Sequence, residues 1–158
     1  MPKQRKQKVV KSKKQKSDKG LGLGQLIKTT RRFAYIHEKA RDVRLYQPRR
    51  ELTDDGNIRI TATAKSRKSR ENPQPQKHVC YIEGVNDRSK LSSPKAMVRV
   101  SCDCEFFTYT CEVALFRYGA AEVLYSNGEF PFSTNPRGTP ILCKHLLNLA
   151  NAIKKKGY

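Results

Sequence analysis

The stretch "VRVSCDCEFF", residues 98–107, decides the fold, because its alternating apolar residues predict a strand that ends in two metal-ligand side chains. Cys102 and Cys104 stand at positions i and i+2, and on a strand such positions point to the same face. Both sulfurs can therefore reach one ion at the point where the strand ends.

A second pair of candidate ligands opens the last apolar helix, in "ILCKHLLNLA" at residues 141–150. Positions i and i+2 of a helix lie about 200° apart, so Cys143 and His145 cannot share a metal from the middle of a helix. We therefore expect Cys143 in the turn before the helix and His145 in its first turn. Pro140 and the apolar stripe that begins at Leu146 place the helix start there independently.

Three thiolates and one imidazole are a usual tetrahedral ligand set for structural zinc, and soft sulfur ligands argue against calcium or magnesium. The sequence therefore predicts one structural Zn²⁺, with the ligands Cys102, Cys104, Cys143 and His145. Four protein ligands leave no open position on the metal, so catalysis there is not expected. The alternative is a set of buried cysteines with a capping histidine.

The other cysteines and histidines are expected to be structural. Cys111 is a rival ligand whose coordination would release one of the four, but the short spacing within the two pairs favours them. Cys111 is then a buried thiol, and Cys80 is expected to face the core of its strand. His78 and His37 have no partner at ligand spacing and are interpreted as surface or core residues.

A Cys-x-Cys pair after a strand, aromatic residues shortly afterwards (Phe106 and Phe107), and a Cys-x-His pair that opens an apolar helix resemble the SWIM-type zinc finger. The resemblance spans roughly residues 78–156 and extends to small SWIM-bearing proteins of tailed phages. It implies a strand–strand–helix arrangement and a nucleic-acid or protein interaction module. The 38 residues between the two pairs exceed the usual spacing, so residues 105–142 would be an insertion.

Basic residues are concentrated in the first half of the 158-residue chain. Residues 1–77 hold 23 Lys/Arg and 7 Asp/Glu, a net charge of +16, whereas residues 78–158 hold 10 and 7, a net charge of +3. The total of +19 is enough to attract polyanions without a specific site. We therefore expect a boundary near residue 77.

The basic half is expected to comprise an arm, a helix and a linker. Residues 1–24 form a basic flexible arm because like charges repel, and "GLGLGQ" at residues 20–25 is its hinge. Residues 25–77 are predicted to contain a basic amphipathic helix over 25–46, a turn at "DDGN", a strand over 58–64 and a polar linker over 65–77.

Residues 78–158 are predicted to form the zinc-binding domain. Its expected elements are strands over 78–85 and 96–102, a short helix over 109–119 with Thr108 or Thr110 as N-cap, a hairpin around Asn127-Gly128, a turn at 135–138 and a helix over 144–156. The predicted fold class is α+β: a small zinc-stabilised strand–strand–helix domain with an inserted helix and hairpin, preceded by a basic arm and helix.

No Ser/His/Asp set or paired carboxylates are visible, so we expect neither an enzyme nor a small-molecule substrate. The charge pattern instead predicts a protein that associates with nucleic acid through its basic half and leaves DNA and RNA both open. The residues expected to contact phosphates are Lys3, Arg5, Lys6, Lys8, Lys11, Lys13, Lys14, Lys16, Arg31, Arg32, Lys65, Arg67, Lys68 and Arg70.

Two alternatives stay open. The chain could be a structural component of a large assembly such as a tailed-phage virion, its arm contacting neighbouring proteins or packaged DNA, or an accessory finger that recruits another protein. No apolar run of about 18 residues and no signal peptide are visible, so we expect no membrane partner and no secretion. An odd cysteine count of five suits metal ligands in an intracellular reducing compartment, or in a virion.

Overall fold

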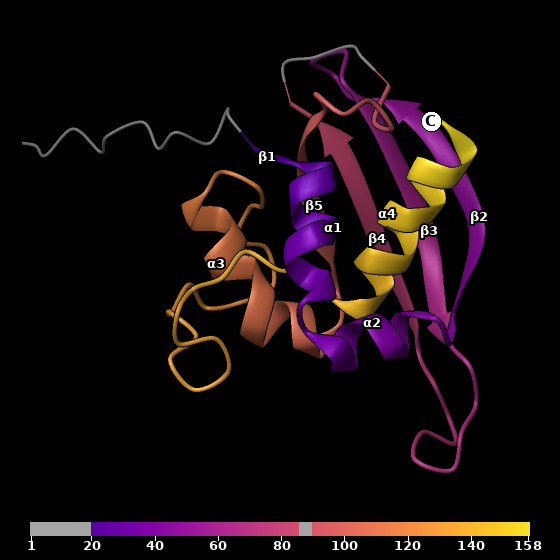
Figure 1. The fold of residues 1–158 in the computed structure, drawn as a ribbon, viewed down its shortest axis with the longest axis vertical. Coiled ribbons are helices and arrows are strands. Elements are labelled where there is room, and N and C mark those ends of the chain that lie inside the picture. The colour runs from indigo at the N-terminus through magenta and orange to yellow at the C-terminus, as the bar shows by residue number, and fades with distance from the viewer. Residues whose placement is uncertain (1–19, 86–89) are drawn as a thin grey trace, which may run out of the picture.

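The computed structural model describes residues 20–85 and 90–158, which form a five-stranded antiparallel sheet with helices packed on it (Figure 1). The strand order is β1-β5-β4-β3-β2. The strands are β1 (Leu21–Gly22), β2 (Val43–Leu52), β3 (Ile58–Ser66), β4 (Lys77–Gly84) and β5 (Met97–Cys102). The helices are α1 (Leu23–Arg31), α2 (Ala34–Ala40), the π-helix η1 (Phe107–Cys111), α3 (Glu112–Arg117) and α4 (Lys144–Lys156). The predicted α+β class is confirmed.

The two faces of this sheet differ in cover. Helix α4 packs against strands β2 to β5 and against α1 and α2, and Figure 1 shows α1 and α4 on the same side of the sheet. Along β3 the burial alternates, because side chains of a strand point to opposite faces in turn. Ile58, Ile60, Ala62 and Ala64 are buried under the helices on what we call the covered face. The alternate residues, such as Thr61 and Thr63, are half-buried, and we call their side of the sheet, as formed by the described residues, the uncovered face.

The predicted helix over residues 25–46 is wrong as a single element. The chain forms α1, turns, forms α2, and from Val43 onward runs as strand β2. Val43 pairs with Ser66 and Leu45 with Ala64, so the start of β2 gains ladder hydrogen bonds that a helix would forgo. The apolar spacing fits a helix up to Ala40, but beyond it the β-branched Val43 fits the sheet as well.

Proline is tolerated in β2 because this strand lies at the edge of the sheet. The pairing of β2 with β3 shifts between Tyr46 and Arg49, and Gln47 adopts a φ of 47° at this bulge. Pro48, expected to end a helix, therefore lies within a bulged edge strand.

The predicted hinge at residues 20–25 is also wrong. Leu21 and Gly22 pair with β5, and α1 begins at Leu23. Gly20 has a φ of +56°, and a Cβ atom there would lie 2.6 Å from the carbonyl oxygen of Val98. The glycine thus allows close approach of two backbones. Residues 1–19 of the predicted arm lie outside the described residues.

The boundary predicted near residue 77 is a change in composition and not in the fold. Strands β3 and β4 pair across it, with Lys65 opposite Lys77. One cluster of buried residues includes Leu26 and Ile60 from the basic half together with Leu146 from the neutral half. The predicted turn at "DDGN" and strands over 58–64, 78–85 and 96–102 are confirmed, and most of the predicted linker is the β3–β4 loop, residues 67–76.

The predicted hairpin around Asn127-Gly128 is absent, since residues 120–143 contain no strand. The reason lies in Glu112, which is fully buried and whose carboxylate accepts backbone N–H groups of Leu124, Tyr125 and Ser126. These three N–H groups are bound to one carboxylate, so they are not available for the hydrogen bonds of a β-hairpin.

Two local predictions in this region are confirmed. The turn at residues 135–138 closes with a hydrogen bond from the Gly138 N–H to the Asn135 carbonyl oxygen. Helix α4 ends where expected, with Gly157 in the left-handed conformation at a φ of 75°.

Among the described residues, no helix is both long and apolar enough to cross a membrane.

Candidate metal centre

The four predicted ligands meet in the folded chain. One ligand atom from each of Cys102, Cys104, Cys143 and His145 lies within 4.8 Å of all the others, and all four residues are buried. Nδ1 of His145 lies 3.8 Å from Sγ of Cys102 and 4.0 Å from Sγ of Cys143. A Zn–N bond of about 2.0 Å and Zn–S bonds of about 2.3 Å in a tetrahedron would place the nitrogen about 3.5 Å from each sulfur. The cluster could therefore hold one metal ion. We call these four residues the cysteine–histidine cluster.

Two helix starts position the cysteines by the same local geometry. Sγ of Cys104 accepts the N–H of Phe107, and Sγ of Cys143 accepts the N–H of Leu146, each at 3.4 Å. Both sulfurs thus cap a helix N-terminus, whose partial positive charge favours a thiolate. As predicted, Cys143 precedes α4 and His145 lies in its first turn. The helix predicted over 109–119 instead begins at residue 105, so neither threonine caps it.

The second pair is held in place by α1. The buried hydroxyl of Thr30 accepts the backbone N–H of Leu142 at 2.9 Å and donates to the carbonyl oxygen of Leu26 at 2.7 Å. Further along α4, the amide of Asn148 donates to the carbonyl oxygens of Ala40 and Val43. Helix α4, and with it the second ligand pair, is therefore fixed by segments from the basic half.

The three thiols of the cluster do not ionise alike. Hydrogen bonds from the Cys102 and Cys143 side chains lower the pKa of Cys104 well below its usual value. The bond to Cys104 raises the pKa of Cys102, and burial raises that of Cys143. A metal bound by all three sulfurs would displace the protons of these thiols, so metal affinity should rise with pH.

The remaining cysteines lie outside the cluster, as predicted. Sγ of Cys80 donates to the carbonyl oxygen of Ala62 at 3.6 Å, and burial raises the pKa of this thiol to about 12. Cys111 is fully buried, and burial raises its pKa well above the usual value. Both are neutral core thiols, and the cluster is formed without the rival ligand Cys111.

His78 is a site residue that the sequence prediction missed. Its Nδ1 lies 3.0 Å from Oδ1 of Asp103, and its ring centroid lies 4.7 Å from that of His145. Asp103, the residue between the first two cysteines, also accepts the N–H of Val79 at 3.2 Å. The signal is the pairing of Cys80 with Cys102 across β4 and β5, which no spacing along the chain reveals. His37 has no such role: its Nδ1 is buried without a hydrogen-bond partner.

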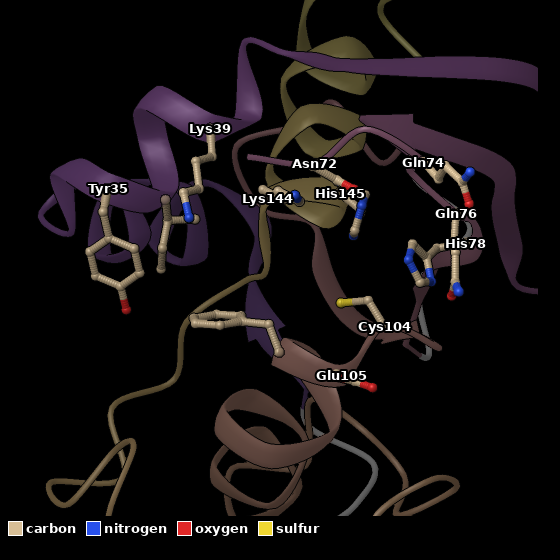
Figure 2. A pocket seen from close by; sticks show the side chains of 12 residues that line it. Tyr35, Lys39, Asn72, Gln74, Gln76, His78, Cys104, Glu105, Lys144 and His145 are labelled. Carbon is tan, nitrogen blue, oxygen red and sulfur yellow. The ribbon is translucent and has the colours of Figure 1, made fainter. Parts of the chain in front are cut away.

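A cleft of about 430 Å³ opens beside the cluster (Figure 2). Figure 2 shows the rings of His78 and His145 projecting into it above the sulfur of Cys104. Its lining residues are Tyr35, Ile36, Lys39, Asn72, Gln74, Gln76, His78, Cys104, Glu105, Phe106, Lys144 and His145. Three of these are amides from the β3–β4 loop, so the segment predicted as a linker forms one wall of the site.

Among the described residues, the predicted phosphate contacts lie at the end of α1 and around the β3–β4 loop. Lys3 through Lys16 lie outside the described residues. Arg31 and Arg32 are exposed at the end of α1, where Arg31 donates to the side-chain oxygen of Asn151 at 3.1 Å. Three of the others line a groove of about 550 Å³, which we call the basic groove. Its lining is Arg44, Tyr46, Lys65, Ser66, Arg67, Lys68, Pro73, Gln74 and Pro75, and Arg70 is exposed in the adjoining loop.

No protein-family model, curated protein or solved structure matches this chain. The geometry of the four side chains alone therefore supports the metal centre.

Proposed function

We propose that this chain is a non-enzymatic zinc-binding protein of the SWIM type that associates with nucleic acid through its basic N-terminal half. The observation that carries the proposal is the buried cluster of three cysteines and one histidine, all within 4.8 Å. Thiolates select soft metals, and three sulfurs with one imidazole form a common closed zinc site. The strand before the first pair and the helix after the second agree with the SWIM pattern.

In this proposal the zinc is structural. The cluster joins the end of β5 to the start of α4, two segments about 40 residues apart, so one ion would close a long loop across the core. With four protein ligands, no open position is left on the metal for a substrate. The ring of His78, which Asp103 holds by a hydrogen bond, would pack beside the ligand His145 and limit its movement.

The charge distribution supports nucleic acid as the partner. The first 77 residues carry a net charge of +16, and their described cations on β2 and in the β3–β4 loop are mostly exposed. Each phosphate that such a surface neutralises releases a counterion, which makes binding strongly salt-dependent.

The experiment is to purify the full chain, measure its metal content by elemental analysis, and titrate it into labelled DNA and RNA over a salt series. We expect one zinc per chain, and an affinity whose logarithm falls linearly with the logarithm of salt concentration. Replacing the lysines and arginines of residues 1–19 by glutamine should reduce that slope by about 0.7–0.9 per lost phosphate contact. Absence of zinc, or an affinity independent of salt, would contradict the proposal.

A second candidate, a component of a large assembly such as a tailed-phage virion, is favoured by the surface of the insertion. Its exposed large apolar residues are Tyr109, Tyr118, Leu124, Tyr125 and Phe132, with Phe132 75% exposed. Aromatic side chains of this kind are enriched where proteins contact each other. The particle mass measured after purification from the native source separates the two: a large particle with fixed stoichiometry favours the assembly component.

A further inference from the structure

The basic groove lies at one end of the uncovered face, where cations stand opposite cations. Arg44 of β2 pairs in register with Lys65 of β3, and Lys65 pairs with Lys77 of β4. Like charges directly opposite each other destabilise a sheet. The groove adds Arg67 and Lys68, and none of its lining residues is acidic. This end of the sheet therefore carries a concentrated charge that an anion would relieve.

At the opposite end of the same face, a carboxylate neutralises two arginines. Arg59 donates to Glu83 from both Nε and Nη2, at 2.9 and 2.7 Å, and Arg99 approaches the same carboxylate at 3.4 Å. No ion pair found within residues 20–85 and 90–158 includes a cation of the basic groove. The cations of the basic groove therefore have no carboxylate partner among the described residues.

An aromatic ring lies among these cations. Tyr46 is 43% exposed, lines the groove and stands opposite Thr63, two residues from Arg44 on the same face. The bulge at Gln47 follows it directly, and bulges commonly re-aim side chains. Tyr46 takes part in none of the ring–ring contacts found in the described part of the chain. The groove therefore combines an available ring with several free cations.

We propose that the basic groove binds a segment of single-stranded nucleic acid, with a base stacked on Tyr46 and phosphates on Arg44, Lys65, Arg67 and Lys68. Cations that track a backbone beside an aromatic ring are the usual means of binding single strands. In a duplex the bases are stacked inside, so the ring could not reach a base face. The inference rests on the proposed function and adds to it the site and the strandedness of the ligand.

The test compares full-length variants by fluorescence anisotropy with labelled oligothymidylate, and with its duplex with oligoadenylate, over a salt series. We expect Tyr46→Ala to weaken single-strand binding about tenfold or more, to leave duplex binding unchanged, and to be rescued by Tyr46→Phe. The pair Arg44→Ala with Lys65→Ala should lower the single-strand salt slope by about 1.4, or 0.7 per phosphate contact.

Matched controls lie outside the groove. Tyr109→Ala removes another exposed tyrosine, and Lys95→Ala with Arg137→Ala removes two other exposed cations. Circular dichroism and thermal melting should show that every variant folds, since the substituted side chains are exposed or half-buried.

The outcomes separate the inference from the proposed function. Wild-type binding with a steep salt slope that Tyr46→Ala leaves intact would overturn the groove proposal alone. Equal losses on single strand and duplex would overturn the stacking assignment, and displacement by polyglutamate as effective as by unlabelled strand would assign the groove to an acidic protein instead. No binding to either nucleic acid at low salt would overturn both.

Discussion

The two faces of the sheet carry two different kinds of chemistry. On the covered face, Ile60, Ile82 and Cys102 are fully buried, and the cysteine–histidine cluster joins the sheet to α4. On the uncovered face, the same strands carry Thr63, Val79 and a row of cations, half-buried or exposed. Adjacent residues of one strand therefore have different roles: one packs in the core, and the next forms part of a polar surface.

The division of the chain by charge does not coincide with a division of the fold. The basic half supplies β1, β2 and β3 as well as α1 and α2, so it contributes to the core and to the support of α4. Its charges lie largely on the alternate positions of the strands and on loops. The division between stability and surface chemistry thus runs between the faces of the sheet and not at residue 77.

The largest effect is expected from the cluster on the covered face. If the cluster holds a structural zinc as proposed, the double change Cys143→Ser with His145→Ala should abolish zinc binding and unfold the protein. Structural zinc contributes on the order of 10 kcal/mol, which matches the whole stability of a small domain, about 5–15 kcal/mol. Because the core is shared, β2 and β3 should unfold together with α4. Elemental analysis and circular dichroism check both outcomes.

Cys111→Ala is the matched control for that prediction. Cys111 is as deeply buried as Cys143 but lies outside the cluster. The variant should lose some stability through a small cavity yet retain one zinc per chain and its fold. Full zinc content in the Cys143/His145 double variant, or loss of zinc from Cys111→Ala, would show that the ligand set is wrong.

A second prediction compares the two faces on a single strand. Ile82 and Val79 both lie in β4, but Ile82 is fully buried on the covered face and Val79 is 50% exposed on the other. We expect Ile82→Ala to lower the free energy of unfolding by about 2–5 kcal/mol and Val79→Ala by at most about 1 kcal/mol. Urea denaturation measures both. Similar losses would mean that something covers the second face in solution.

The sequence predicted the cluster because its ligands come in short pairs, whose geometry is local. It also predicted β3, β4, β5 and α4, whose patterns are regular over their whole length. It failed where tertiary pairing decides: Val43 fits the helical stripe but pairs with Ser66, and the Asn127-Gly128 loop closes on the distant Glu112. His78 was missed for the same reason, since only the register of β4 and β5 brings it to the cluster.

A third prediction concerns two glycines that the sequence assigned to one flexible hinge. Gly20→Ala should cost about 2 kcal/mol or more, because alanine is strained at a φ of +56° and its Cβ would lie 2.6 Å from the Val98 oxygen. Gly24→Ala should stabilise by about 0.5–1 kcal/mol, because this residue lies within α1 and a Cβ there meets nothing within 4 Å. Thermal melting of both variants gives the sign of each change in stability. If Gly20→Ala leaves the stability unchanged, the hinge interpretation would be restored.

The smallest effect is expected from the cation row of the uncovered face, and its sign is the informative part. Lys65→Gln removes the central charge between Arg44 and Lys77 and should stabilise the fold by about 0.2–1 kcal/mol. The gain should be measured in urea at low ionic strength and should vanish at high salt, since ions screen exposed charges. Lys95→Gln, which lies outside the row, should change nothing. If Lys65→Gln stabilises the fold but weakens single-strand binding, Lys65 is retained for binding at a cost in stability. If Lys65→Gln instead lowers stability, the row of cations is not repulsive and no anion is needed to balance it.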